Sequence, residues 1–164
     1  MLTLVKHGLN HMRHVPATVM FPYLNNKCKW MLLHENGTNV DVCSVYMAAE
    51  VISAEYIAWN ADLLSMIQAE LASLRGQGYS CVLMGDFNGH IGCDAQGVAG
   101  NLPYINHNGR LARDFCSCND LLVVNADKSR CTGIFMRVVT NSVSLLDLLA
   151  EDATPGGVVH YGGG

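Results

Sequence analysis

Residues 80–88 read SCVLMGDFN, a short apolar run that ends in Gly-Asp-Phe-Asn. A run of this length, between the end of a helical pattern and a glycine, is typical of a strand buried on both faces of a sheet. In an extended backbone Asp86 and Asn88 point to the same side, and Phe87 between them points into the core. The pair then suits hydrolysis of a phosphate ester, because Asp86 can orient or deprotonate a water while Asn88 donates to the developing oxyanion. The alternative is an Asx turn after the strand, since Asp, Asn and Gly all favour turns.

Upstream of this run the sequence predicts a hairpin and a helix. Two strand-like runs, 30–33 and 40–46, are joined by Asn36-Gly37, a dipeptide that favours a tight hairpin turn. Ser53 is a suitable N-cap for a helix that ends at Gly76. The helix carries one apolar stripe at helical spacing, which we expect to pack on the sheet: Ile57, Leu64, Ile67, Leu71 and Leu74.

Downstream, the alternation of strands and helices continues. Residues 108–118 predict a helix, 121–124 a buried strand, and 143–149 an apolar run that contains one carboxylate, Asp147. Strands that alternate with helices predict a mixed α/β fold in which helices cover a sheet. In such folds the strand ends usually carry the chemistry.

Composition bounds the class of protein. The chain has 164 residues, of which 50% are hydrophobic and 15% charged, so it supplies a core and is not a disordered segment. Ten Lys and Arg against 14 Asp and Glu give a net charge of −4, so no global basic field indicates nucleic-acid binding. A chain with this charge can still bind nucleic acid if a metal ion and local hydrogen-bond donors contact the phosphates. No apolar run reaches the length of a membrane helix.

The cysteines and histidines are better explained without disulfides or a metal. The seven cysteines are odd in number and include no C-x-x-C pair, which favours free, mostly buried thiols in a reducing compartment. We therefore expect an intracellular protein, nuclear or cytoplasmic. His7, His11 and His14 share one face if their segment is helical. No cysteine or carboxylate joins them, so a solvated face is favoured over a metal site.

Four segments together resemble a known family. Residues 82–92, VLMGDFNGHIG, resemble the VLMGDFNAHIG stretch of endonuclease/exonuclease/phosphatase domains, above all the apurinic-endonuclease-like nucleases of non-LTR retrotransposons. Residues 106–125 resemble that family's N-x-N-G-x-x-L…F…N-L…V-N stretch. Residues 43–46 resemble its strand ending in tyrosine, and 132–147 its T…S-x-x-D pair. The resemblance extends from about Trp30 to Leu149.

The resemblance implies a fold, a reaction and roles for individual residues. The fold is a partial four-layer α/β sandwich, with two packed mixed sheets and helices outside, and the activity is that of a magnesium-dependent phosphodiesterase, a DNA endonuclease of the retrotransposon type. Asp86 is the implied base or water-orienting carboxylate, Asn88 stabilises the transition state, Tyr46 donates to the scissile phosphate, and Asp147 holds a catalytic histidine. Two further positions are implied to bind the substrate: Thr132 and Asn108.

Parts of the family pattern are not identifiable in this sequence. They are an early strand with an asparagine, the glutamate that binds the metal, and a final Ser-Asp-His segment; Glu35 lies in the predicted turn and His160 in a glycine-rich setting. We therefore expect a poorly defined segment at 1–28, a partial domain at 29–150 and a glycine-rich, disordered tail at 151–164. An incomplete domain is expected to have low stability and to aggregate, because it leaves strand edges and apolar surface uncovered.

Three interpretations follow. The chain is an active magnesium-dependent endonuclease that binds DNA, a catalytically dead fragment derived from a retrotransposon, or a non-enzymatic interaction module. The missing glutamate and histidine favour the second for the chain as given. Nothing in the sequence indicates a particular protein partner for the third.

Overall fold

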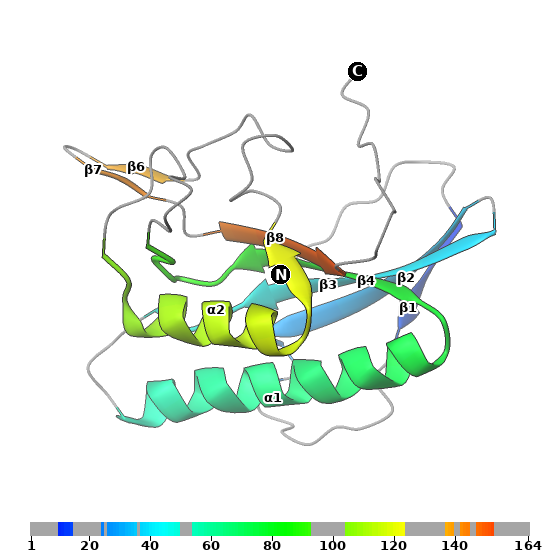
Figure 1. Cartoon of the computed structure of the whole chain (residues 1–164), viewed down its shortest axis with the longest axis horizontal. Helices are drawn as coiled ribbons and strands as arrows, with labels where there is room; N and C mark the ends of the chain where they lie inside the picture. Colours follow the sequence, from blue (N-terminus) through cyan, green and yellow to red (C-terminus); the bar gives the residue numbers. More distant parts are fainter. Residues whose placement is uncertain are drawn as a thin grey trace.

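The computed structural model describes residues 10–14, 24, 26–35, 37–49, 54–92, 104–123, 137–139, 142–144 and 147–152. They form a six-stranded mixed sheet in the order β1-β2-β3-β4-β8-β5, with both helices along one face (Figure 1). The sheet and its two helices consist of β1 (Asn10–His14), β2 (Cys28–Glu35), β3 (Thr38–Tyr46), α1 (Ala54–Gly76), β4 (Ser80–Asp86), α2 (His107–Cys118), β5 (Leu121–Val123) and β8 (Asp147–Asp152).

The predicted mixed α/β class is confirmed. Two further strands, β6 (Arg137–Val139) and β7 (Ser142–Ser144), pair with each other in a separate two-stranded sheet. The second full sheet of a four-layer sandwich stays a prediction. The large sheet includes β1, from the expected N-terminal segment, at one edge and β5 at the other, and its strand β8 continues to Asp152.

The predicted hairpin is confirmed as β2 and β3. Glu35 pairs with Thr38, so residues 36 and 37 alone connect the strands, and Gly37 adopts a φ of 81°. β1 pairs antiparallel with the outer edge of β2, so His11 and His14 lie on a strand. The helical interpretation of their spacing is wrong, because the ladder offered by the edge of β2 outweighs a weak local pattern. His7 lies outside the described residues.

Helix α1 connects the parallel strands β3 and β4 and covers one face of the sheet (Figure 1). Four residues of its predicted stripe are buried: Leu64, Ile67, Leu71 and Leu74. Ile57 is 41% exposed, so its assignment to the core is wrong. It lies one turn before Asn60, where the buried face of α1 begins, so the apolar spacing starts one turn earlier than the burial does.

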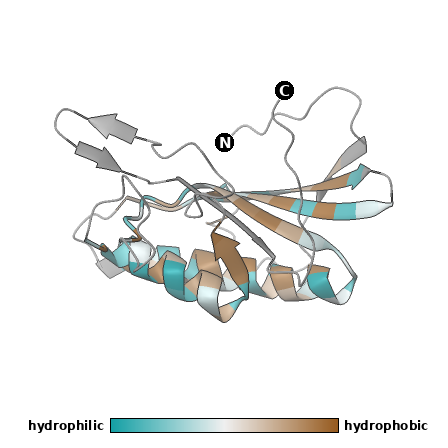
Figure 2. Ribbon diagram, turned by 45° about the horizontal axis from the view of Figure 1, so that its top comes forward, coloured by the Kyte–Doolittle hydropathy of each residue, from teal (hydrophilic) through white to brown (hydrophobic). Residues whose placement is uncertain are grey.

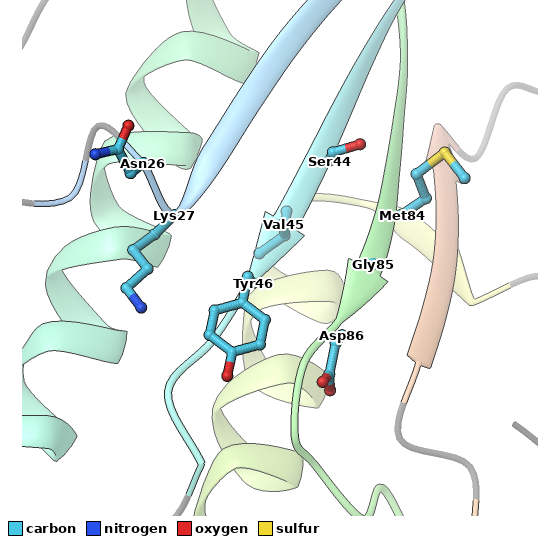
Figure 3. A pocket seen from close by; sticks show the side chains of 8 residues that line it. All are labelled: Asn26, Lys27, Ser44, Val45, Tyr46, Met84, Gly85 and Asp86. Carbon is cyan, nitrogen blue, oxygen red and sulfur yellow. The ribbon is translucent and has the colours of Figure 1, made fainter. Parts of the chain in front are cut away.

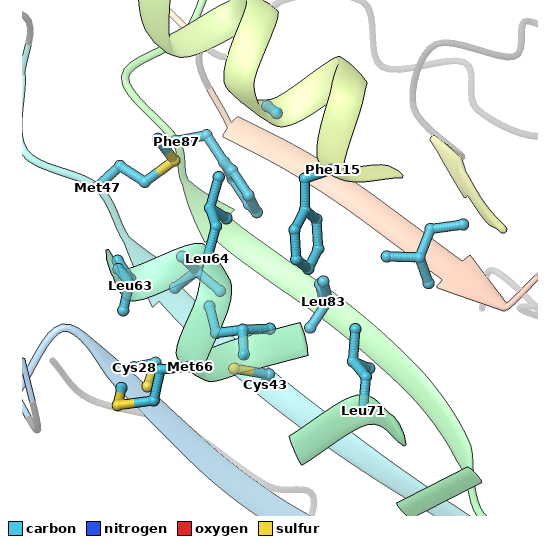
Figure 4. Packing of buried hydrophobic residues seen from close by; sticks show 14 of the residues in the cluster. Cys28, Cys43, Met47, Leu63, Leu64, Met66, Leu71, Leu83, Phe87 and Phe115 are labelled. Atoms are coloured by element: carbon cyan, nitrogen blue, oxygen red, sulfur yellow. The ribbon is translucent and has the colours of Figure 1, made fainter. Parts of the chain in front are cut away.

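The core lies between the helices and the sheet face that they cover. Phe87 is 1% exposed, as predicted, and packs in one cluster with residues of β3, α1 and α2 (Figure 4). Apolar residues run along the strands of the sheet (Figure 2). Burial of β4 on both faces is wrong, because Leu83 is 0% exposed whereas Met84, on the opposite face, is 43% exposed. The described helices cover only one of these faces.

The described cysteines are free thiols, which confirms the prediction for these five: Cys28, Cys43, Cys81, Cys116 and Cys118. Burial raises the pKa of Cys116 to about 11, whereas Cys118 is exposed at the end of α2. Within the described ranges, no helix has both the length and the apolar composition needed to cross a membrane.

We expect iodoacetamide at pH 8 to alkylate Cys118 much faster than Cys116. A pKa of about 11 leaves about one Cys116 in a thousand as the reactive thiolate at this pH, and burial blocks access to it. Peptide mapping by mass spectrometry over a time course measures both rates in the same sample. Equal rates in the folded protein would contradict the burial of Cys116, and equal rates in urea are the control.

Candidate active site at the carboxyl ends of β3 and β4

A pocket of about 560 Å³ opens where the parallel strands β3 and β4 end (Figure 3). Adjacent carboxyl ends of parallel strands are a common position for active sites, because side chains of both strands converge there. The pocket is lined by Asn26, Lys27, Ser44, Val45, Tyr46, Met84, Gly85 and Asp86.

Sheet register aligns three of the predicted site residues. Tyr46 pairs with Asp86 across β3 and β4, and Asp86 pairs with Asp147 across β4 and β8. Tyr46 is 42% exposed, and its hydroxyl and the Asp86 carboxylate point the same way (Figure 3). Two of the predicted residues therefore share the pocket, and the backbone of Asp147 lies beside them.

The chain turns sharply after Asp86. The backbone N–H of Asn88 donates to Asp86 Oδ1 at 2.8 Å, which is the Asx turn of the alternative interpretation, and Asn88 adopts a φ of 46°. The extended backbone predicted through Asn88 is therefore wrong. The turn orients the carboxylate and leaves its second oxygen, Oδ2, for water or substrate, as far as the contacts of the described residues go.

The side chain of Asn88 is tied to the chain that follows β3. Its Nδ2 donates to the carbonyl of Met47 at 2.9 Å, and Asn88 is not among the residues that line the pocket. One N–H of the amide is thus used within the protein, and the second has no acceptor among the described residues.

Gly85 brings β4 close to β3 directly beside the pocket. Its φ is 140°, and a Cβ at this position would lie 2.1 Å from the carbonyl oxygen of Val45. No other residue fits this backbone without displacing a neighbouring strand. The glycine before Asp86 is therefore required by packing as well as by its positive φ.

Three asparagines hold the loop after β4 against the two helices. Asn108, 1% exposed, donates from Nδ2 to the carbonyls of Ala48 and Asn88, at 2.9 and 3.3 Å. Asn60 joins it from α1 with a 2.9 Å bond to Asn108 Oδ1. Asn106, the N-cap of α2, accepts from the backbone N–H groups of His90 and Gly109, both at 2.8 Å. Asn108 therefore holds Asn88 in place, and its contact with a substrate stays a prediction.

Lys27 lines the pocket although no sequence motif indicated it. The backbone N–H of Tyr46 donates to its carbonyl at 2.7 Å, and its Nζ lies 4.7 Å from the centre of the Tyr46 ring. The register of the predicted hairpin could have identified Lys27. Glu35 pairs with Thr38, so each step back along β2 matches one step forward along β3, which brings Lys27 opposite Tyr46.

Other predicted parts of the site lie elsewhere. Thr132 falls outside the described residues. No group of three or more His, Cys, Asp or Glu side chains that could hold a metal ion occurs in the part of the chain that the structure describes. Among the described residues that line the pocket, Asp86 contributes the one carboxylate.

Comparisons with known proteins identify the fold of the chain through solved structures. No protein-family model matches the sequence, and no curated protein matches it. Among solved structures, the endonuclease domain of TRAS1, a telomere-specific non-LTR retrotransposon, matches with a TM-score of 0.56 and 14% identity, over 88% of this chain and 54% of that one. An endonuclease/exonuclease/phosphatase family protein from Bacteroides thetaiotaomicron matches with a TM-score of 0.45 and 16% identity, over 77% of this chain and 41% of that one. The chain thus spans about half the length of these structures, and it shares the fold of a retrotransposon endonuclease domain over that part.

Proposed function

We propose that the chain hydrolyses phosphodiester bonds of DNA in the pocket at the ends of β3 and β4. One observation carries the proposal: a tyrosine hydroxyl and an oriented carboxylate stand on neighbouring strand ends and face one pocket. The fold shared with a retrotransposon endonuclease domain supports DNA as the substrate. The four segments that resemble endonuclease/exonuclease/phosphatase domains occur in the family's order along the chain, which supports the same interpretation.

In the proposed reaction Asp86 activates water. The Asn88 N–H holds Oδ1, so Oδ2 accepts a proton from a water as the water oxygen attacks phosphorus. The bond from phosphorus to the leaving sugar oxygen breaks, and that oxygen takes up a proton from a solvent water. Tyr46 donates its O–H to a non-bridging oxygen and stabilises the charge that develops there.

The other predicted residues have supporting roles in this proposal. Asp147, beside Asp86 in the sheet, corresponds to the carboxylate that orients the catalytic histidine in the family pattern, a histidine not identifiable in this sequence. Thr132 contacts the DNA backbone. The second amide N–H of Asn88 donates to the phosphate. Asn108 acts as a positioning residue, because its bond to the Asn88 carbonyl holds the turn in place.

Magnesium is the cofactor that the resemblance implies. Mg²⁺ is commonly held by one or two carboxylates together with substrate phosphates and water. Among the described pocket residues the Asp86 carboxylate is the one group that would bind Mg²⁺, and substrate phosphate and water would supply the other ligands. No step of the proposed reaction passes through the metal. Nicking is therefore measured both with MgCl₂ and with EDTA.

We expect Tyr46→Phe to slow nicking of supercoiled plasmid by about tenfold to a hundredfold. The change removes one hydrogen bond to a charged group, worth about 1.5–3 kcal/mol, and keeps the ring on which Lys27 rests. Conversion of supercoiled to open-circular DNA, followed on agarose gels under single-turnover conditions, measures the rate.

Tyr56→Phe is the matched control, because Tyr56 contacts Trp59 on α1 and does not line the pocket. Its nicking rate should equal that of the parent chain. A parent chain that binds DNA but leaves the plasmid supercoiled would refute hydrolysis and favour the catalytically dead fragment or the non-enzymatic module.

A further inference from the structure

Lys27 is held in the site by its backbone. It immediately precedes β2, its N–H donates to the carbonyl of Leu24 at 2.7 Å, and its own carbonyl accepts from Tyr46 at 2.7 Å. Residues paired across neighbouring strands have their side chains on the same face. Lys27, Tyr46 and Asp86 therefore form one row across three strands, on the face that carries the pocket.

The row has a charge at each end. Among the described residues that line the pocket, Lys27 carries the one positive charge and Asp86 the one negative charge. Neighbouring strands are about 4.8 Å apart, so the two backbones are separated by roughly 10 Å, with Tyr46 between them. The Lys27 ammonium rests over the Tyr46 ring at 4.7 Å, which holds the cation near the tyrosine (Figure 3).

The charge of the whole chain makes this cation significant. A net charge of −4 repels a polyanion at long range, so attraction to DNA has to come from local cations. We propose that Lys27 is a substrate-binding residue whose ammonium contacts a non-bridging oxygen of the phosphate seated over Tyr46. This inference rests on the proposed function and adds to it the residue that neutralises the phosphate.

Binding and its salt dependence test the contact. A fluorescein-labelled DNA duplex is titrated with the full chain in EDTA, and Kd is measured by anisotropy at several NaCl concentrations. We expect Lys27→Met to weaken binding by about tenfold and to reduce the slope of log Kd against log [NaCl] by about 0.9, the change for one lost phosphate contact. Lys27→Arg should keep the slope of the parent chain.

Lys29→Met is the matched control. Lys29 pairs with Ser44, farther along the strands from Asp86, and is not among the residues that line the pocket. Its slope should stay within about 0.3 of the parent value. A structural role for Lys27 through the Tyr46 ring would lower the melting temperature without changing the slope, and that result overturns the proposal.

The outcomes separate this inference from the proposed function. A parent chain that nicks DNA while Lys27→Met keeps the parent salt slope, or changes it no more than Lys29→Met does, refutes the role of Lys27 alone. A parent chain that binds DNA without nicking refutes hydrolysis, while a reduced slope for Lys27→Met still supports the phosphate contact. A parent chain that binds no DNA at low salt refutes both.

Discussion

Asp86→Asn is expected to lower the nicking rate by about 10²–10⁴-fold, the loss typical of removing a general base. The amide has the shape of the carboxylate, and its Oδ1 can still accept the N–H of Asn88, so the turn after β4 is kept. The substitution replaces Oδ2, the oxygen that accepts the proton, with an NH₂ group that cannot accept one. Single-turnover nicking of supercoiled plasmid, with protein in excess over DNA, measures the change.

Asp114→Asn is the control for this substitution. Asp114 is an exposed carboxylate on α2, outside the pocket, and its removal alters the net charge by the same amount. The control should nick at the parent rate. If Asp86→Asn retains at least half of the parent rate, Asp86 is not the base, and the Asx turn is its whole role. A variant that unfolds is recognised by its circular dichroism spectrum.

Gly85→Ala is expected to destabilise the fold by about 3 kcal/mol or more. Two costs add: a side chain at a φ of 140°, and a Cβ placed 2.1 Å from the Val45 carbonyl oxygen in the next strand. Domains of this size have only about 5–15 kcal/mol of stability, so a large share is lost. Urea unfolding followed by circular dichroism at 222 nm measures the free energy of unfolding, and a lower midpoint with an unchanged slope is expected.

Gly76→Ala is the matched substitution. Gly76 ends α1 without a positive φ, and no atom beyond its chain neighbours and its own helix backbone lies within 4 Å of a Cβ built there. Alanine at that position should leave the midpoint unchanged or raise it slightly, because alanine favours helix. Equal midpoints for Gly85→Ala and Gly76→Ala would show that β3 and β4 are not in the close contact described.

The predictions that held depend on local chemistry. A two-residue Asn-Gly turn determines the β2–β3 pairing, and the apolar spacing from Leu64 to Leu74 determines the buried face of α1. The predictions that failed depend on where an element meets its neighbours. Ile57 has the right spacing but lies at the exposed start of α1, and Met84 belongs to a central strand whose second face no described helix covers.

For the candidate site too, local features could be predicted from the sequence and contacts between distant segments could not. The motif after β4 is sufficient to identify Asp86 and to predict its position at a strand end, and the hairpin turn contains the register that brings Lys27 opposite Tyr46. Periodicity cannot predict the direction of the Asn88 side chain. That direction depends on a hydrogen bond to the carbonyl of Met47, 41 positions earlier in the chain. It also depends on the hydrogen bonds that Asn106 and Asn108 donate to the carbonyl of Asn88. Turn and strand preferences act between near neighbours and can be read from the sequence, whereas contacts between distant segments exist only once the sheet and its helices have assembled.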